Sequence, residues 1–202
     1  MKGKLIALEG PDGCGKTTHA KLLADWLRSQ EYEVLVTDEP TDGPIGRILK
    51  RALHGELRLS LEAEALLFAA DRVQHSTQVI EPALDEGKIV ITERYLYSSL
   101  AYQSARGLSR EWIKTINEAA PKPDLAILID VPAEIALKRI KSSRALDIFE
   151  QDLELQRRVR TNYQEVAKSE GLKVVDGSSK IEKTQTEIGN HVDAVLHANL
   201  SR

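Results

Sequence analysis

The sequence contains one cysteine, no long hydrophobic run and no excess of charge of one sign. The single cysteine, Cys14, cannot form an internal disulfide bond, which is typical of proteins in a reducing compartment. No stretch approaches the ~18 consecutive apolar residues of a membrane span, and the amino-terminal apolar run is too short for a signal peptide. These absences predict a cytoplasmic protein that does not bind a membrane.

Basic residues are not in excess either, since 28 Lys and Arg residues accompany 31 Asp and Glu residues and give a net charge of −3. This balance creates no basic field that would collect nucleic acid, so an anion must be bound by a local group of residues. The 202 residues, 42% of them hydrophobic and 29% charged, suffice for one sizeable hydrophobic core. Because no repeat, low-complexity tract or flexible linker divides the chain, we expect a single domain over 1–202.

Short apolar runs alternate with longer helical patterns along the chain. The runs lack in/out alternation, which indicates strands covered by helices on both faces. They are 5–8, 34–36, 89–91, 125–129 and 172–175. Helical patterns cover 16–29, 61–84, 133–140 and 147–170, and a further helix follows Ser109. This order predicts a three-layer α/β fold with a five-stranded parallel sheet and right-handed crossovers.

The stretch GPDGCGKT, at 10–17, matches the phosphate-loop pattern G-x-x-x-x-G-K-[ST] and lies between a predicted strand and a predicted helix. In such a loop, backbone N–H groups hold phosphate oxygens, the lysine reaches the outer phosphates and the hydroxyl ligates Mg²⁺. We therefore expect a P-loop NTPase-type fold and Mg²⁺ bound by Thr17. The predicted ATP-binding residues are Gly10, Pro11, Asp12, Gly13, Cys14, Gly15, Lys16, Thr17 and Thr18. A glycine-rich turn with a surface lysine is the alternative.

A second motif, Thr92-Glu93-Arg94-Tyr95, follows the third predicted strand. Ligands bind outside the carboxyl ends of the strands in an open parallel sheet, so Glu93 and Arg94 are expected to project into the site. The carboxylate of Glu93 suits Mg²⁺ or its water, and the guanidinium of Arg94 suits a bidentate grip on a second phosphate. A surface Arg–Glu pair is the alternative. A GTPase switch is disfavoured because no Asn-Lys-x-Asp tetrapeptide is present.

Four segments, EGPDGCGKTT, LLFAADR, TERYLYSSLAYQ and PDLAILIDVP, together resemble thymidylate kinase over about residues 4–176. The resemblance implies a nucleoside monophosphate kinase that uses ATP and Mg²⁺ to phosphorylate dTMP to dTDP by direct in-line transfer, in dTTP biosynthesis. It also implies a homodimer, for which the helix within 61–79 is a candidate face unless that helix is buried in its own core. A kinase with a different acceptor and a non-catalytic nucleotide-binding regulator are the competing hypotheses.

The resemblance also assigns the acceptor site. It implies that Phe68 stacks on thymine, that Arg72 hydrogen-bonds the edge of the base and that Arg94 holds the acceptor phosphate. Phe68 as a plain core residue is the alternative. The remaining substrate-binding residues implied are Asp12, near the 3′-hydroxyl, with Glu39, Ser99, Tyr102, Gln103 and Phe149. A local turn for Asp12 and helix packing for Phe149 compete with these roles.

A lid over about 139–150 is expected to supply a further cation, because Gly13 stands where some family members carry an arginine. The predicted catalytic set is Lys16, Glu93, Arg94 and the lid residue Arg144. Arg139 is expected to stack on adenine, and a solvated helix face is the alternative for both lid arginines. Asp38, Glu93 and the run SRALDI depart from the family pattern, and the effect of these departures stays open.

Overall fold

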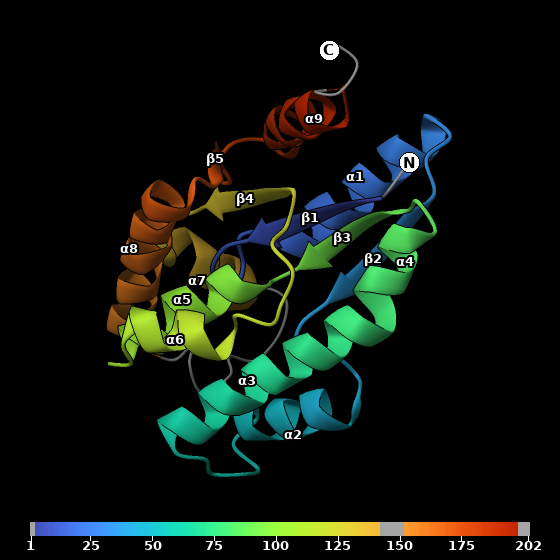
Figure 1. Ribbon diagram of the computed structural model, residues 1–202. Coiled ribbons are helices and arrows are strands. Elements are labelled where there is room, and N and C mark those ends of the chain that lie inside the picture. The colour runs from blue at the N-terminus through green and yellow to red at the C-terminus, as the bar shows by residue number, and fades with distance from the viewer. Residues whose placement is uncertain (1–2, 142–151, 198–202) are drawn as a thin grey trace.

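The computed structural model describes residues 3–141 and 152–197. One sheet of five parallel strands runs through the described residues in the order β2-β3-β1-β4-β5 (Figure 1). The strands are β1 (Lys4–Glu9), β2 (Val34–Asp38), β3 (Ile89–Glu93), β4 (Leu125–Asp130) and β5 (Lys173–Asp176). Each of the five predicted strands is present, and the predicted α/β fold class is confirmed.

Helices cover both faces of this sheet. They are α1 (Lys16–Ser29), α2 (Pro44–Leu53), α3 (Leu61–His75), α4 (Glu81–Asp85), α5 (Leu96–Ala105), α6 (Arg110–Ile116), α7 (Ala133–Lys141), α8 (Leu153–Glu170) and α9 (Ile181–His197), with a π-helical segment η1 (Ser76–Ile80). Leu5 and Ala7 of β1 pack with residues of α4, α5, α6 and α8, whereas Ile6 and Leu8 pack with residues of α1, α7 and α9. Successive side chains of a strand point to opposite faces, so β1 is buried on both sides, as in a three-layer architecture.

The predicted helices are present, and three more accompany them. The pattern over 61–84 corresponds to α3, η1 and α4 in succession, and the pattern over 16–29 coincides with α1. The helix expected from residue 147 is described from Leu153 onward, with Asp152 as its N-cap, and 147–151 lie outside the described residues. Helices α2, α5 and α9 were not predicted. In α9 the buried stripe contains Thr184 beside Ile188 and Val192, and this polar member obscured the helical period.

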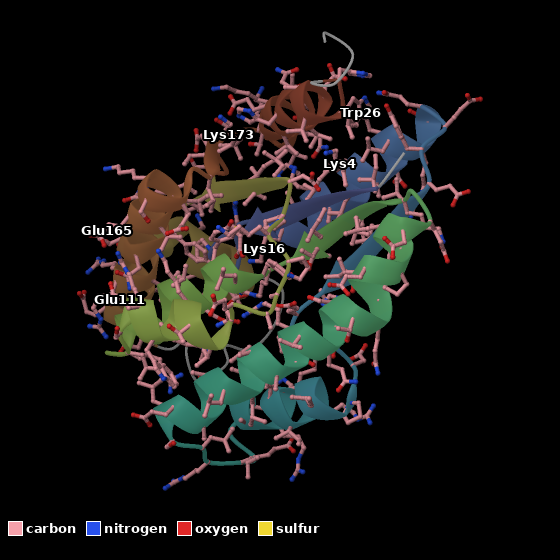
Figure 2. All side chains as sticks on the ribbon, viewed as in Figure 1. Lys4, Lys16, Trp26, Glu111, Glu165 and Lys173 are labelled. Carbon is pink, nitrogen blue, oxygen red and sulfur yellow. The ribbon has the colours of Figure 1, made fainter. Side chains whose placement is uncertain are left out.

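The topology places two connections side by side. Strand β1 lies between β3 and β4, so the segment that follows β1 and the segment that follows β3 leave adjacent strands at the same edge of the sheet. This is the position where open parallel sheets form their ligand crevice. Figure 2 shows Lys16 well inside the outline of the molecule, while Glu111 and Glu165 lie at its periphery. Among the helices within 3–141 and 152–197, none is both long and apolar enough to cross a membrane.

Candidate active site

Two pockets meet at the carboxyl ends of the strands. The loop pocket is lined by Asp12, Gly13, Gly15, Lys16, Thr17, Thr18, Asp38, Glu39, Glu93, Arg94, Arg139 and Ile140. The aromatic pocket is lined by Asp12, Glu39, Pro40, Leu53, Glu64, Phe68, Arg72, Arg94, Ser98, Ser99, Tyr102, Gln103 and Arg106. Asp12, Glu39 and Arg94 line both, so a group held in one pocket lies next to a group held in the other.

The phosphate loop connects β1 to α1 and forms one wall of the loop pocket. Lys16, the first residue of α1, is buried, and its Nζ atom donates hydrogen bonds to the carbonyl oxygens of Gly10 at 2.9 Å and Pro11 at 3.0 Å. The helix N-terminus adds unpaired N–H groups and partial positive charge at the same place. The ammonium and the helix end therefore make this wall attractive to a polyphosphate.

Position 13 in this loop accepts only glycine. Its φ of 75° lies in the left-handed region, and a side chain there would collide with the carbonyl oxygen of Ala136 in α7. An arginine at this position would require α7 to move. The close packing of Gly13 against α7 thus gives a physical reason for the absence of an arginine at position 13.

Thr17 and Glu93 bring two oxygen groups together at the mouth of the loop pocket. The Thr17 hydroxyl donates a hydrogen bond of 2.6 Å to the Glu93 carboxylate, which joins the start of α1 to the end of β3. Oxygen ligands are the ones that Mg²⁺ prefers, so these two residues fit the predicted cation. Among the described residues no group of three or more His, Cys, Asp or Glu side chains could hold a metal ion.

Arg94 lies between the two pockets and is paired with the phosphate loop. Its backbone has a φ of 67°, a left-handed conformation that non-glycine residues seldom adopt and that is enriched at functional sites. Its Nη2 atom contacts Asp12 Oδ1 at 2.5 Å, and its guanidinium lies 5.1 Å from the centre of the Tyr102 ring. The Tyr102 hydroxyl donates to Asp12 Oδ2 at 3.1 Å. The predicted residues Asp12, Arg94 and Tyr102 thus form one cluster.

This cluster changes the acidity of Asp12. Burial would raise the pKa of the carboxyl group, but the charges of Arg94 and Lys16 and the hydrogen bonds from Arg94 and Tyr102 outweigh it and lower the pKa to about 2. Asp12 is therefore ionised at neutral pH and remains a permanent partner for the neighbouring cations.

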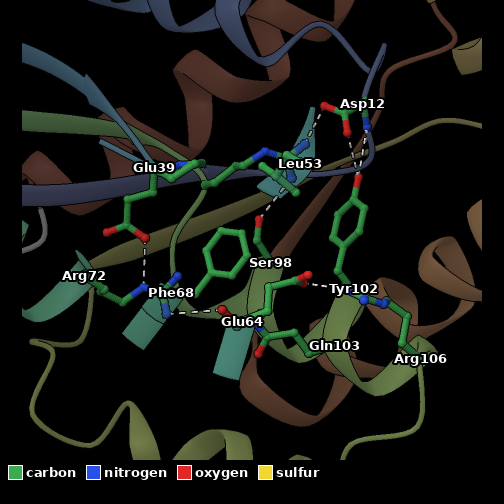
Figure 3. A pocket seen from close by; sticks show the side chains of 13 residues that line it. Asp12, Glu39, Leu53, Glu64, Phe68, Arg72, Ser98, Tyr102, Gln103 and Arg106 are labelled. Atoms are coloured by element: carbon green, nitrogen blue, oxygen red, sulfur yellow. Dashed lines mark hydrogen bonds and ion pairs between the residues drawn. The ribbon is translucent and has the colours of Figure 1, made fainter. Parts of the chain in front are cut away.

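The aromatic pocket is formed largely by α3 and α5. Phe68 and Arg72 lie one turn apart on α3, and both line the pocket. Phe68 is half-buried and belongs to the wall rather than to the sealed interior. Figure 3 shows the side chains of Phe68, Ser98, Gln103 and Tyr102 around the same space. A flat apolar ring with polar groups at its edge is a suitable surface for a planar heterocycle.

Arg72 is only 1% exposed, and its charge is balanced by an ion pair. Its Nε atom donates to Glu39 Oε2 at 2.8 Å, and its Nη1 atom donates to Ser99 Oγ at 3.2 Å and to Asn117 Oδ1. Glu39 and Ser99 were both predicted as substrate-binding residues. The structure places both as partners that orient Arg72.

Gln103 carries a polar atom that lacks a partner in the described part of the chain. The residue is 2% exposed and lines the aromatic pocket, and its Oε1 atom is buried without a hydrogen bond. Because a buried unpaired polar atom costs about 1–3 kcal/mol, such an atom in a pocket wall indicates a ligand group that satisfies it.

The other predicted residues occupy the periphery of the site or fall outside the described residues. Arg139 lines the loop pocket and donates to the carbonyl oxygens of Gly177 at 3.0 Å and Gly13 at 3.5 Å. Thr18 is exposed at the same wall, and Cys14 is buried within the phosphate loop. Arg144 and Phe149, with most of the predicted lid, lie outside the described residues.

Sequence reasoning missed a buried carboxylate next to the site. Glu9, at the end of β1, is fully buried and accepts hydrogen bonds from the backbone N–H groups of Tyr95 and Ser98 and from the Ser98 hydroxyl. Burial raises its pKa. The residue fixes the start of α5 behind Arg94. Its position directly after an apolar run, and directly before the phosphate loop, was the available signal.

Asp71 was missed as well, although it lies between Phe68 and Arg72 in the sequence. It is 2% exposed and accepts hydrogen bonds from the backbone N–H of Thr41 at 2.8 Å and from the Thr41 hydroxyl at 2.7 Å. It thereby holds the loop that follows Pro40 against α3. A charged residue adjacent to a predicted binding residue is a weak signal, because on a helix it points elsewhere.

Comparisons with known proteins agree with this geometry. The sequence model of the thymidylate kinase family matches residues 8–188. The probable thymidylate kinases of Pyrococcus abyssi and Pyrococcus horikoshii are each 50% identical over 194 residues, which cover 93% of this chain and 95% of each relative. The probable thymidylate kinase of Pyrobaculum calidifontis is 51% identical over 192 residues, which cover 95% of this chain and 94% of that protein.

Proposed function

The chain belongs to the thymidylate kinase family, and we propose how its two pockets divide the reaction of that family between them. The protein is a phosphotransferase of the nucleoside monophosphate kinase type that uses ATP to phosphorylate dTMP to dTDP. The activity predicted from the four motifs is confirmed at this level. A kinase for another acceptor and a non-catalytic regulator are not favoured.

The loop pocket is the donor site in this proposal. The polyphosphate of ATP lies along the backbone of residues 10–17, with the ammonium of Lys16 on its outer phosphates. Thr17 and Glu93 are the residues that hold Mg²⁺, directly or through water. When bound, the cation neutralises charge on the phosphate oxygens. Arg139, at the edge of this pocket, is proposed to contact adenine.

The aromatic pocket is the acceptor site, and its polar groups match thymine. The base stacks on Phe68, while Arg72, which can only donate hydrogen bonds, meets a carbonyl oxygen of the base. The side-chain amide of Gln103 offers a donor and an acceptor next to each other, as do the N3–H and carbonyl groups of thymine. Cytosine places an amino group where thymine has O4, and two donors cannot pair.

Arg94 is the residue that joins the two sites. It holds the phosphate of dTMP so that one of its oxygens attacks the terminal phosphorus of ATP in line with the leaving oxygen of ADP. The new P–O bond forms as the bond to the β-phosphate bridge breaks, and ADP departs. The observation that carries this proposal is the position of Arg94 and Asp12 in the walls of both pockets. The cation predicted at Arg144 stays a prediction.

The acceptor assignment is tested by measuring ADP release with dTMP, dUMP, dCMP, AMP and GMP. We expect dTMP to be the best acceptor and dCMP to be far poorer, because Arg72 faces the edge at which the two bases differ. A crystal structure with a thymidine nucleotide should show the base against Phe68. Absence of turnover with dTMP would overturn the proposal, and a base bound elsewhere would overturn the residue assignment.

We also propose that the protein forms a homodimer through the outward face of α3. A shallow apolar groove there is lined by residues of α2, α3, η1 and α6, and Leu66 and Val79 are 49% and 38% exposed. An apolar face of this kind pairs with a second copy of itself around a twofold axis. Leu66→Glu should convert the dimer to a monomer in analytical ultracentrifugation, whereas Glu62→Lys, on the same helix, should not. A dimer that survives Leu66→Glu would use another face.

A further inference from the structure

His75, the last residue of α3, lines neither pocket but contacts Glu39, which lines both. It is 3% exposed, yet both ring nitrogens have partners. Nδ1 lies 3.1 Å from Glu39 Oε1, and Nε2 lies 2.7 Å from the hydroxyl oxygen of Thr37 on β2. A buried imidazole held at both nitrogens has one orientation.

The Glu39 carboxylate requires a hydrogen on Nδ1 of His75. A carboxylate only accepts, so Nδ1 carries the hydrogen that is donated to Glu39, whereas the Thr37 hydroxyl can act as donor or acceptor toward Nε2. Thr37 therefore acts at one remove, because its hydroxyl anchors Nε2 and holds the ring in the orientation in which Nδ1 donates to Glu39.

Glu39 links the orientation of the His75 ring to that of the Arg72 guanidinium. Its Oε1 atom is bound by His75 and its Oε2 atom by Arg72 Nε at 2.8 Å, so both oxygens are committed and the carboxylate plane is fixed. Ser99 and Asn117 occupy Nη1 of the same guanidinium. Within the described residues no hydrogen bond is formed by Nη2, and Arg72 lines the aromatic pocket.

We propose that His75 is a positioning residue for acceptor recognition: the chain Thr37–His75–Glu39 fixes the Arg72 guanidinium so that its remaining N–H groups face the keto edge of the pyrimidine. The inference rests on the proposed role of Arg72 as the reader of the base. Without the bond from Nδ1, Glu39 can rotate and Arg72 can turn with it, so the enzyme loses discrimination between keto and amino bases rather than catalytic power.

Two substitutions separate the two ring nitrogens of His75. The short amide of Asn reaches the position of Nδ1, whereas the longer amide of Gln reaches that of Nε2. We expect His75→Asn to keep the KM for dTMP within about threefold of the wild-type value, and His75→Gln to raise it about tenfold. The KM for ATP and kcat should stay within about threefold in both, because neither substrate phosphate is contacted.

The decisive readout is the ratio of kcat/KM for dTMP to that for dCMP. In His75→Gln this ratio should fall by about the same tenfold factor, and in His75→Asn it should not. A residue that only stabilises the fold would lower the melting temperature in both variants and leave the ratio unchanged. An unchanged ratio in His75→Gln would overturn the proposal.

Two further variants keep the test decisive if His75→Gln does not fold. Thr37→Val removes the hydroxyl that anchors Nε2 and should lower the same ratio, while Thr37→Ser keeps the hydroxyl and should not. Arg72→Gln distinguishes the proposed role of Arg72 in reading the base from the proposed role of His75 in positioning Arg72. If it leaves the ratio unchanged, the proposed role of Arg72 fails. If it lowers the ratio but His75→Gln does not, or Thr37→Val does not where His75→Gln fails to fold, only the positioning role of His75 fails.

Discussion

The aromatic pocket and the loop pocket hold their cations in different ways. In the aromatic pocket, Arg72 is fully buried and tied to Glu39, Ser99 and Asn117, which come from three other segments of the chain. In the loop pocket, Lys16 donates hydrogen bonds to atoms of its own loop, namely the carbonyl oxygens of Gly10 and Pro11 and the sulfur of Cys14. A guanidinium fixed in this way suits selection among bases that differ by one hydrogen-bonding group. An ammonium that can exchange its loop partners for phosphate oxygens suits phosphates that bind, react and leave.

The largest effect on turnover should come from the loop pocket. Lys16→Met removes the cation that faces the outer phosphates of ATP, and we expect kcat to fall on the order of 10³-fold. The affinity for dTMP should hardly change, because the aromatic pocket is built without Lys16. Steady-state kinetics and calorimetric titration with dTMP measure the two effects separately.

Lys21→Met on the exposed side of α1 is the matched control, and it should leave kcat unaltered. The assignment of separate roles to the two pockets would be wrong if Lys16→Met weakened dTMP binding as strongly as it slowed turnover. That result would mean that the loop and α3 act as one unit.

Arg94→Lys should have the second largest effect, because Arg94 belongs to both pockets. Lysine keeps the charge but loses the planar pair of donors, so kcat/KM for dTMP should fall on the order of 10²-fold. The KM for ATP should change far less. Arg110→Lys provides a control for the exchange itself, because Arg110 is paired with Glu165 and neither residue lines either pocket. An effect confined to the KM for ATP would move Arg94 to the donor side alone.

The sequence predicts the loop pocket better than the aromatic pocket. The phosphate loop is contiguous, so eight residues identify Lys16 and Thr17 together with their surroundings. Phe68, Arg72 and Arg94 were located by short motifs and by resemblance. The partners of Arg72 lie 33 residues away at Glu39 and 27 residues away at Ser99, and no local pattern records such contacts.

The same reasoning explains the successes and failures in the fold. Strands β1, β3 and β4 are buried on both faces, and their uninterrupted apolar runs predicted them directly. Helix α9 was missed because Thr184 belongs to its buried stripe, where its hydroxyl is satisfied by the carbonyl oxygen of Asp176. A polar side chain with a tertiary partner breaks the periodicity on which the prediction depends.

The smallest effect is on stability rather than on turnover, and it tests how strongly Asp12 is paired with Arg94 in the folded protein. The pKa of Asp12 falls from its ordinary 3.8 to about 2 in the folded protein, so its carboxylate stabilises the fold above pH 3.8 and that stabilisation disappears as the pH falls through about 2. Asp12→Asn removes this dependence. The difference in unfolding free energy between wild type and Asp12→Asn should therefore shrink by about 1–2 kcal/mol between about pH 5 and pH 2.

Denaturant titrations of both proteins across this pH range measure that difference, and Asp25→Asn, on the exposed side of α1, controls for the loss of one negative charge. A difference that stays constant with pH would mean that Asp12 and Arg94 stabilise each other only weakly in the unliganded protein. Arg94 would then be free for phosphate from the outset. A difference that shrinks as expected means that the dTMP phosphate must share Arg94 with Asp12, and that part of its binding free energy offsets the weakening of this ion pair.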